Sequence, residues 1–363
     1  MLKYLMTTEI GISKYKNING VTCYMNSILA ILQQLPLFSD YIVSGKFKDL
    51  LRDNNHTNKI SFQLHKLFRV SMSLDNANLT PSTLRKVCSD KDEIWGENQQ
   101  QDSAEFLQFM ITKIEEEIGR TVDFVPGSKI NHEYLTSDIS NSFELIQAMS
   151  SYQSFIKKEF SPIKTLFTGL EKTKTTCKVC QNMKNNFQTF SIWQLPIPQA
   201  NPNKVTELKD CMDKWFEVEK LDDHNRLSCD FCGVKSNASK TFSIFIPPKI
   251  LVIQLKRFKS GRVSRKINDY VDYPIYDLDI SKYISDSSPN KHKCKYNLLG
   301  INIHQELGSY ANINMGHYVS ILKNRYDNEW YLFNDDNKPM KVDEVEQLVN
   351  SKTYLLFYYR TNY

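Results

Sequence analysis

The chain has 363 residues, of which 41% are hydrophobic and 24% are charged, and its formal net charge is +5. This hydrophobic content allows a substantial buried core, and the charge forms no long basic run that would indicate a nucleic-acid-binding surface. No apolar run is long enough to span a membrane, and the first ten residues lack the apolar region of a signal peptide. We therefore expect an intracellular protein, cytoplasmic, nuclear or both, with no nucleic-acid or membrane partner.

The first predicted element is a helix over residues 24–35, where apolar residues recur at helical spacing and Pro36 ends the pattern. Thr22 is a plausible helix cap, and Gly20 permits the turn into the helix. Cys23 would then lie in the first turn, where unpaired N–H groups and the helix dipole favour a thiolate. The alternative is a small buried cysteine, which is what most free cysteines are.

A second helix is predicted over residues 103–118. Its apolar residues follow the spacing of one helix face: Leu107, Met110, Ile111, Ile114 and Ile118. Asp102 and Glu105 form a cap pair at its start. Packing explains the apolar stripe, but it explains less well the polar run from Gln100 to Asp102.

Four of the eight cysteines form two Cys-x-x-Cys pairs, Cys177 with Cys180 and Cys229 with Cys232. Two such pairs complete a tetrahedral zinc site, and four thiolates leave no open position for water, so the expected single zinc is structural. The long interval between the pairs predicts intervening strands, such as residues 188–195. A disulfide or a redox pair is the alternative, and reducing surroundings disfavour it.

Two strands are predicted near the C-terminus, over residues 318–322 and 329–333. His317 precedes the first strand, and Asn334 and Asp335 follow the second. Antiparallel pairing would bring Asn334 or Asp335 next to the imidazole, where an acceptor fixes the histidine tautomer. A core histidine and a polar turn are the alternative interpretations.

Cys23, His317 and an Asn or Asp partner have the residue types of a cysteine hydrolase. In that constellation a thiol attacks a carbonyl, a histidine moves the proton, and a third residue orients the histidine. The sequence therefore predicts acyl transfer through a thioester.

Several further segments occur together with these residues in one order, from about residue 11 to the C-terminus. They are 22–27 (TCYMNS), 100–107 (QQDSAEFL), 250–258 (ILVIQLKRF), 296–304 (YNLLGINIH), 316–318 (GHY), 330–335 (WYLFND) and 354–360 (YLLFYYR). In all of them the chain resembles the ubiquitin-specific protease family of cysteine deubiquitinases. The resemblance covers almost the whole chain.

This resemblance implies catalytic roles for four residues. Cys23 would be the nucleophile, His317 the base and Asn334 the third triad member, with Asp335 as a neighbouring acid that supports or replaces it. The substrate would be ubiquitin, cleaved after its C-terminal glycine from a lysine isopeptide or a peptide bond.

The resemblance also implies a binding site for the extended, arginine-bearing tail of ubiquitin. The residues expected there are Gln101, Asp102, Glu105 and Tyr318. Carboxylates suit such a tail because arginine pairs with them through two hydrogen bonds.

The chain departs from the family pattern at the oxyanion hole. The family's Asn or Asp usually stands five residues before the cysteine, and here that residue is Ile18. Isoleucine offers no side-chain donor, and loss of one such donor typically costs about 10²–10³ in rate. We expect a shifted register in which Asn19, or alternatively Asn17, supplies the donor.

Helices dominate from residue 23 to about 118 and strands from about 165 onwards, which predicts an α+β fold. The resemblance specifies a papain-like cysteine protease core and a single catalytic domain over residues 11–363. Its parts would be a helical thumb (about 11–120), zinc-bearing β fingers (about 165–250) and a β-sheet palm (about 250–363).

The expected partners are ubiquitin and ubiquitinated proteins, and we expect a monomer. Three alternatives stay open at this point. The Ile18 departure allows a catalytically impaired ubiquitin-binding protein, and the same chemistry could act on a ubiquitin-like modifier. A zinc-ribbon nucleic-acid binder would leave the histidine segment unexplained.

Overall fold

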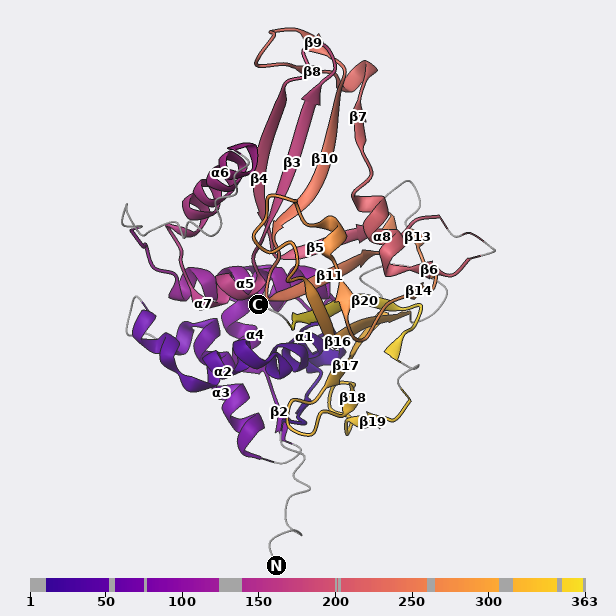
Figure 1. Ribbon diagram of the computed structural model, residues 1–363. Helices are drawn as coiled ribbons and strands as arrows, with labels where there is room; N and C mark the ends of the chain where they lie inside the picture. Colours follow the sequence, from indigo (N-terminus) through magenta and orange to yellow (C-terminus); the bar gives the residue numbers. More distant parts are fainter. Residues whose placement is uncertain are drawn as a thin grey trace, which may run out of the picture.

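A computed structural model describes residues 11–51, 56–74, 77–123, 139–199, 201, 204–259, 265–306, 316–344 and 348–361. Figure 1 shows helices gathered on one side, a large mixed sheet on the other, and a long second sheet that extends away from both. This separation of helices and strands confirms the predicted α+β class.

The helical part contains both predicted helices within one residue of their expected bounds. Its α-helices are α1 (Cys23–Gln34), α2 (Pro36–Ser44), α3 (Ile60–Ser73), α4 (Ser82–Ser89), α5 (Ser103–Ile118) and α7 (Pro162–Phe167). Short 3₁₀ turns are η1 (Ile18–Gly20), η2 (Lys46–Leu50), η3 (His56–Asn58), η4 (Glu93–Gly96), η6 (Asp223–Asn225) and η7 (Ser281–Tyr283).

The start of α1 differs from the prediction in one respect. Thr22 makes no side-chain cap, because its hydroxyl accepts the Ile18 backbone N–H at 2.8 Å instead. Gly20 has φ +71°, as the predicted turn requires. Thr22 therefore occupies the predicted N-cap position, but its side chain stabilises the loop before the helix and does not cap α1.

The large sheet has eight strands in the order β19-β18-β17-β16-β20-β11-β5, with β15 paired to β16. The bounds are β5 (Ile192–Pro196), β11 (Ile250–Lys256), β15 (Leu278–Asp279), β16 (Lys295–Glu306), β17 (Gly316–Lys323), β18 (Trp330–Phe333), β19 (Met340–Val342) and β20 (Thr353–Arg360). Strands β17 and β18 pair antiparallel, as predicted for the histidine and Asn/Asp segments.

The second sheet has the order β4-β3-β10-β7 and forms the long arm at the top of Figure 1. Its strands are β3 (Gly169–Cys177), β4 (Met183–Phe190), β7 (Glu219–Leu221) and β10 (Ala238–Ile246), with the β8–β9 hairpin (Leu227–Ser228, Lys235–Ser236) at the tip. Helices α6 (Ile139–Ile156) and α8 (Leu208–Trp215) lie along β4 and β5 respectively. Two-stranded sheets join β1 (Lys14–Tyr15) to β2 (Asn78–Leu79), β6 (Thr206–Glu207) to β14 (Val271–Asp272), and β12 (Phe258–Lys259) to β13 (Arg265–Lys266).

The strand predicted over residues 188–195 is two strands. Strand β4 ends at Phe190 in the arm, and β5 begins at Ile192 and pairs parallel with β11 in the large sheet. No glycine, proline or charged residue interrupts residues 188–195, so the sequence does not reveal that the chain changes sheets at Ser191.

The main core lies between the helices and the large sheet. All twelve residues of α1 are buried, and its apolar side chains share one cluster with those of α5, β17 and β20. Among the described residues no single helix is long and apolar enough to cross a membrane. Only α1 and α2 together pass that test, as a pair bent by 89°.

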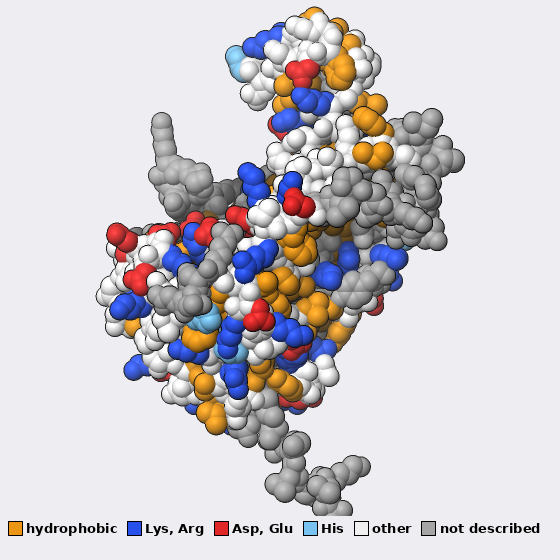
Figure 2. Space-filling model, turned by 90° about the vertical axis from the view of Figure 1, so that its left-hand side faces the viewer, with side chains coloured by type: hydrophobic (Ala, Val, Ile, Leu, Met, Phe, Trp, Pro, Cys, Tyr) orange, Lys and Arg blue, Asp and Glu red, His pale blue; other side chains and the backbone are white. Residues whose placement is uncertain are grey.

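The face shown in Figure 2 has basic, acidic and apolar side chains interspersed, with the tip of the arm standing out as a separate lobe. On this face the positive charge is not gathered into one region.

Candidate active site

Cys23 is the first residue of α1, and its side chain is completely buried. Burial raises the pKa of the thiol to about 11, although the backbone N–H of Tyr318 on β17 lowers it in part. The expected lowering of the Cys23 pKa by the helix start is therefore wrong for this conformation, because desolvation outweighs the helix-end effect. The thiol needs a base to remove its proton.

His317 lies on β17, and Asn334 follows β18. The Nε2 atom of His317 is 2.7 Å from Oδ1 of Asn334. A side-chain amide oxygen only accepts, so Nε2 carries the proton and Nδ1 is left as the free acceptor. The β17–β18 pairing thus produces the predicted His–Asn contact and fixes the tautomer that a general base requires.

Asp335 has a different set of contacts from Asn334. Its two carboxylate oxygens accept hydrogen bonds from Nδ2 of Asn17 and Nδ2 of Asn26, each at 2.8 Å. Its Oδ2 is 3.8 Å from Nε2 of His317, beyond hydrogen-bond range. Burial raises the pKa of Asp335, while the two amides and His317 lower it in part. Asp335 thus fastens the loop and helix that carry Cys23 to the histidine side of the site.

The two oxyanion candidates differ in how firmly they are held. The Asn17 side chain is half-buried: its Oδ1 accepts the Thr22 backbone N–H at 2.8 Å while its amide donates to Asp335. Asn19 lies in η1 with φ +54° and is exposed. Ile18 lies between them. The structure therefore fixes Asn17 in place beside the residue that precedes Cys23, and leaves Asn19 on the surface.

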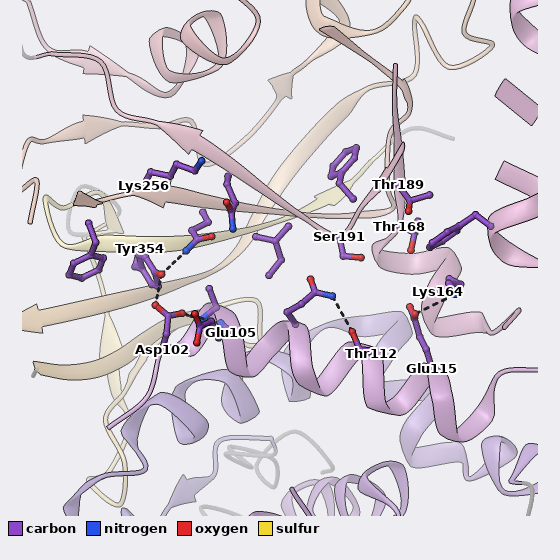
Figure 3. A pocket seen from close by; sticks show the side chains of 18 of the residues that line it. Asp102, Glu105, Thr112, Glu115, Lys164, Thr168, Thr189, Ser191, Lys256 and Tyr354 are labelled. Carbon is purple, nitrogen blue, oxygen red and sulfur yellow. Dashed lines mark hydrogen bonds and ion pairs between the residues drawn. The ribbon is translucent and has the colours of Figure 1, made fainter. Parts of the chain in front are cut away.

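A cleft of about 1010 Å³ runs between α5 and the strands β5, β11 and β20. One wall is the polar face of α5, formed by Asp102, Glu105, Gln108, Thr112 and Glu115. Figure 3 shows Asp102 and Glu105 at one end of this face and Glu115 at the other. The thirteen steps from Asp102 to Glu115, at a rise of about 1.5 Å each, give a wall roughly 20 Å long, enough for about six residues of extended chain.

The predicted tail-binding residues fall into two groups. Glu105 is exposed in the cleft, whereas Asp102 is buried: it caps α5 through the Ala104 and Glu105 N–H groups and accepts the Tyr354 hydroxyl at 2.6 Å. Gln101 is also buried and points toward the Ile94 carbonyl. Asp102 therefore stabilises the start of α5 in addition to any role in binding the tail, and the sequence alone does not distinguish these two roles.

Tyr318 is expected at the tail, and its ring is buried in the core between the large sheet and the helices. It packs against the rings of His304 and Tyr354, at centroid distances of 4.6 and 6.3 Å. It does not line the cleft. Its backbone N–H, which faces Cys23, is the part of Tyr318 that meets the active site.

A charged cluster closes the far end of the cleft. Lys164 is 3.7 Å from Glu115 and 3.4 Å from Glu159, and its ammonium lies over the ring of Phe155. Burial raises the pKa of Glu115 to about 7, and Lys164 only partly offsets this. One lysine thus faces two glutamates, which leaves this end acidic when both are ionised.

Two residues of the site were not identified from the sequence. The sequence predicts Asn334 and Asp335 as site residues. It does not predict Asn26, whose amide donates a hydrogen bond to Asp335, 309 positions away in the chain. Oε1 of Gln100 accepts the Gly316 backbone N–H at 2.9 Å and so ties the loop before α5 to the strand of His317. Asn26 and Gln100 both lie in recognisable motifs, but no local sequence pattern indicates partners so distant in the chain.

The four paired cysteines meet at the tip of the arm, and their sulfur atoms all lie within 4.8 Å of one another. Cys180 and Cys229 are 3.6 Å apart, close to the roughly 3.8 Å that four thiolates about 2.3 Å from a tetrahedral zinc would show. Each Cys-x-x-Cys turn is closed by a backbone bond onto its first cysteine, from Gln181 to Cys177 and from Gly233 to Cys229. The cluster has the residues and the spacing to bind one metal ion.

The helical and sheet halves, the buried cysteine at a helix start and the hydrogen-bonded His–Asn pair on the sheet define a papain-like α+β fold. A family model described as ubiquitin carboxyl-terminal hydrolase matches residues 15–358, and the chain belongs to that family.

Two curated relatives illustrate the likeness. Ubiquitin carboxyl-terminal hydrolase 2 of Bos taurus is 29% identical over 355 residues, covering 96% of this chain and 55% of that protein. Ubiquitin carboxyl-terminal hydrolase Usp2 of Drosophila melanogaster is 30% identical over 353 residues, covering 97% and 35%. The chain therefore spans between about a third and about half the length of these relatives.

Solved structures show the same fold. A yeast SAGA DUBm with an Sgf73 mutant matches with a TM-score of 0.71 at 25% identity, covering 98% of this chain and 70% of that one. The SAGA Ubp8/Sgf11/Sus1/Sgf73 DUB module bound to ubiquitin aldehyde matches with a TM-score of 0.69 at 25% identity, covering 98% and 71%. These neighbours are components of multi-protein modules, so they lend no support to the expected monomer.

Proposed function

We propose that this chain is the catalytic part of a deubiquitinase that hydrolyses the bond after the C-terminal glycine of ubiquitin. The observation that supports this most is that Cys23, at the start of α1, lies against the backbone N–H of Tyr318, the residue next to His317, whose imidazole is hydrogen-bonded to Asn334. The cleft along α5 is long enough for an extended tail. Family membership and the ubiquitin aldehyde bound to the SAGA module agree with it.

Because burial raises the pKa of the Cys23 thiol, the proposed reaction begins with removal of the thiol proton by a base. Nδ1 of His317 takes the thiol proton as Sγ attacks the glycine carbonyl carbon. The imidazolium then protonates the leaving lysine amine, and the C–N bond breaks to give a thioester. Water, deprotonated by His317, attacks the thioester carbon, and Cys23 leaves as a thiol after reprotonation.

Asn334 and Asp335 have separate duties in this proposal. Asn334 holds the imidazole through Nε2, while Asp335 holds the Cys23 segment through Asn17 and Asn26. The acid is thus a positioning residue, and the amide is the triad member.

Asn17 is the side chain that best fits an oxyanion donor. A donor must be preorganised, and Asn17 is held at both ends of its amide, by Thr22 and by Asp335. The sequence alone favours Asn19, a choice that nothing tests; the two hydrogen bonds that hold Asn17 make Asn17 our preferred donor here. Asn17→Ala should lower turnover by about 10²–10³, and Asn19→Ala by less than about twofold. If neither substitution lowers turnover, backbone N–H groups form the oxyanion hole instead.

The acidic face of α5 suits a basic, extended tail. Glu105 is its accessible carboxylate at the catalytic end, so Glu105→Gln should raise KM for ubiquitin substrates without unfolding the protein. Asp102→Asn should lower stability and binding together, because Asp102 also caps α5. If Glu105→Gln leaves KM unchanged, the tail does not use this face.

The metal at the arm tip is inferred to be a single structural zinc. The four cysteines supply a complete set of four thiolates, which fills a tetrahedral zinc and leaves no coordination position for a reacting water. The metal would hold the tip of the arm, which by family likeness contacts the body of ubiquitin. Thiol ligands also agree with an intracellular location, cytoplasmic, nuclear or both.

The test is reaction of the purified chain with ubiquitin that carries a C-terminal electrophile, alongside hydrolysis of a ubiquitin reporter. Cys23→Ala is the control. An adduct and turnover that both depend on Cys23 are the expected result. No adduct and no turnover, with correct folding shown by circular dichroism, would overturn the proposal.

A further inference from the structure

Asn302 occupies an unusual position for a polar side chain. It lies in β16 between Ile301 and Ile303, and it is completely buried. An unsatisfied amide in such a core is costly, so its presence calls for partners. It has two, and both come from the helical half of the molecule.

The Asn302 amide bonds two helices at once. Its Oδ1 accepts the Ser103 hydroxyl at 2.8 Å, and its Nδ2 donates to the Ser27 hydroxyl at 2.9 Å. Ser103 is the first residue of α5, and Ser27 lies in the second turn of α1. Both serines are buried, so water does not compete strongly for these bonds.

These two serines lie next to the parts of the site that must act together. Ser27 follows Cys23 by one helical turn and therefore lies on the same side of α1. Ser103 directly follows Asp102, at the end of the cleft wall where the tail would approach the nucleophile. A helix is stiff over one turn, so a shift at either serine is passed on to its neighbour.

We infer that Asn302 is a positioning residue that sets the distance between the nucleophile helix α1 and the cleft helix α5. The inference rests on the proposed function, and it concerns the rate of the reaction more than the binding of substrate. Misplacement of a nucleophile by about 1 Å can cost about 10²-fold in rate. Asn302 on β16 is the side chain that links Ser27 of α1 to Ser103 of α5 through hydrogen bonds.

The test uses Asn302→Leu, which keeps the branched shape and the number of side-chain heavy atoms of asparagine and removes both hydrogen bonds. Ser320→Ala is the matched control, because Ser320 pairs with Asn302 across β17, is equally buried, and its hydroxyl bonds neither helix. For a ubiquitin reporter, Asn302→Leu should lower kcat by roughly tenfold and change KM by less than about twofold. Ser320→Ala should stay within about twofold of the parent in both.

A second measurement does not depend on activity. Hydrogen exchange of the amides in the first turns of α1 and α5 should accelerate in Asn302→Leu and not in Ser320→Ala. Ser103→Ala, which removes one bond only, gives a milder version of the same change if Asn302→Leu folds poorly. Unchanged exchange at both helix starts, or a KM effect with kcat intact, would overturn the inference. An inactive parent protein with the expected exchange pattern would count against the proposed function alone.

Discussion

Asp335→Asn is a nearly isosteric change whose effect follows from the orientation of two neighbouring amides. The carboxylate accepts Nδ2 of Asn17 and Nδ2 of Asn26. An asparagine at this position has one acceptor oxygen and one NH₂ group. Its oxygen can accept a hydrogen bond from one of the two neighbouring amides, but its NH₂ group then faces the NH₂ group of the other amide, and no hydrogen bond forms there.

The neighbouring amides cannot relieve the conflict by flipping. Oδ1 of Asn17 already accepts the Thr22 N–H, and Nδ2 of Asn26 also donates to the Tyr15 carbonyl at 3.1 Å. A flip of the Asn17 amide would lose its hydrogen bond from Thr22, and a flip of the Asn26 amide would lose its hydrogen bond to Tyr15, so neither flip restores the total. The expected cost is therefore one hydrogen bond to a charged acceptor, about 1.5–3 kcal/mol of the free energy of unfolding.

The assay is denaturant unfolding of Asp335→Asn beside Asp336→Asn. Asp336 is the exposed neighbour, and a surface change of this kind should alter the unfolding free energy by less than about 0.5 kcal/mol. The midpoint should fall for Asp335→Asn with an unchanged denaturant slope, and turnover should fall with it because the Cys23 segment loosens. Equal stability of the two variants would refute the assignment of Asp335 as the residue that fastens this segment.

Three further predictions concern ionisation and the metal. Alkylation of Cys23 by iodoacetamide should keep accelerating from pH 6 to 9, because a pKa of about 11 leaves about one thiol in a thousand ionised at pH 8; a plateau below pH 8 would contradict this. For Glu115, burial raises the pKa from 4.5 to about 7, so the folded chain holds a proton that the unfolded chain has lost, and stability falls as pH rises from about 5 to 7. In Glu115→Gln the unfolding free energy should lose this pH dependence, which amounts to at most about 3 kcal/mol. If the unfolding free energy of both proteins changes equally with pH, the raised pKa of Glu115 is contradicted. Purified protein should contain one zinc per chain by elemental analysis and Cys229→Ser should lose it, whereas metal-free parent protein of unchanged stability would exclude the structural zinc.

The sequence predicted the elements near the site well because each has a strong local signal. The apolar spacing of α5 gave its bounds, and the alternation around His317 gave two strands whose pairing places Asn334 at the imidazole. The Cys-x-x-Cys pairs likewise predicted a cluster that the fold brings together.

Burial changed two interpretations that local pattern had suggested. The first turn of a helix favours a thiolate in isolation, but Cys23 is so fully desolvated that its pKa rises. Asp102, which lines the cleft, also bonds the α5 backbone and Tyr354, so a structural role is added to the predicted tail binding, which stays a prediction. Neither outcome is visible without knowing what packs on top of each side chain.

The sequence by itself predicted the identity of the reacting groups, because nucleophile, base and metal ligands are chemical types that stand in recognisable motifs. Only the tertiary structure decided their duties: that Asn334 orients the histidine while Asp335 holds the Cys23 segment, and that Asn302 joins α1 to α5. The physical reason is that a hydrogen bond forms between neighbours in space. Asn302 and Ser27 are 275 positions apart in the chain, and no local periodicity encodes such a contact.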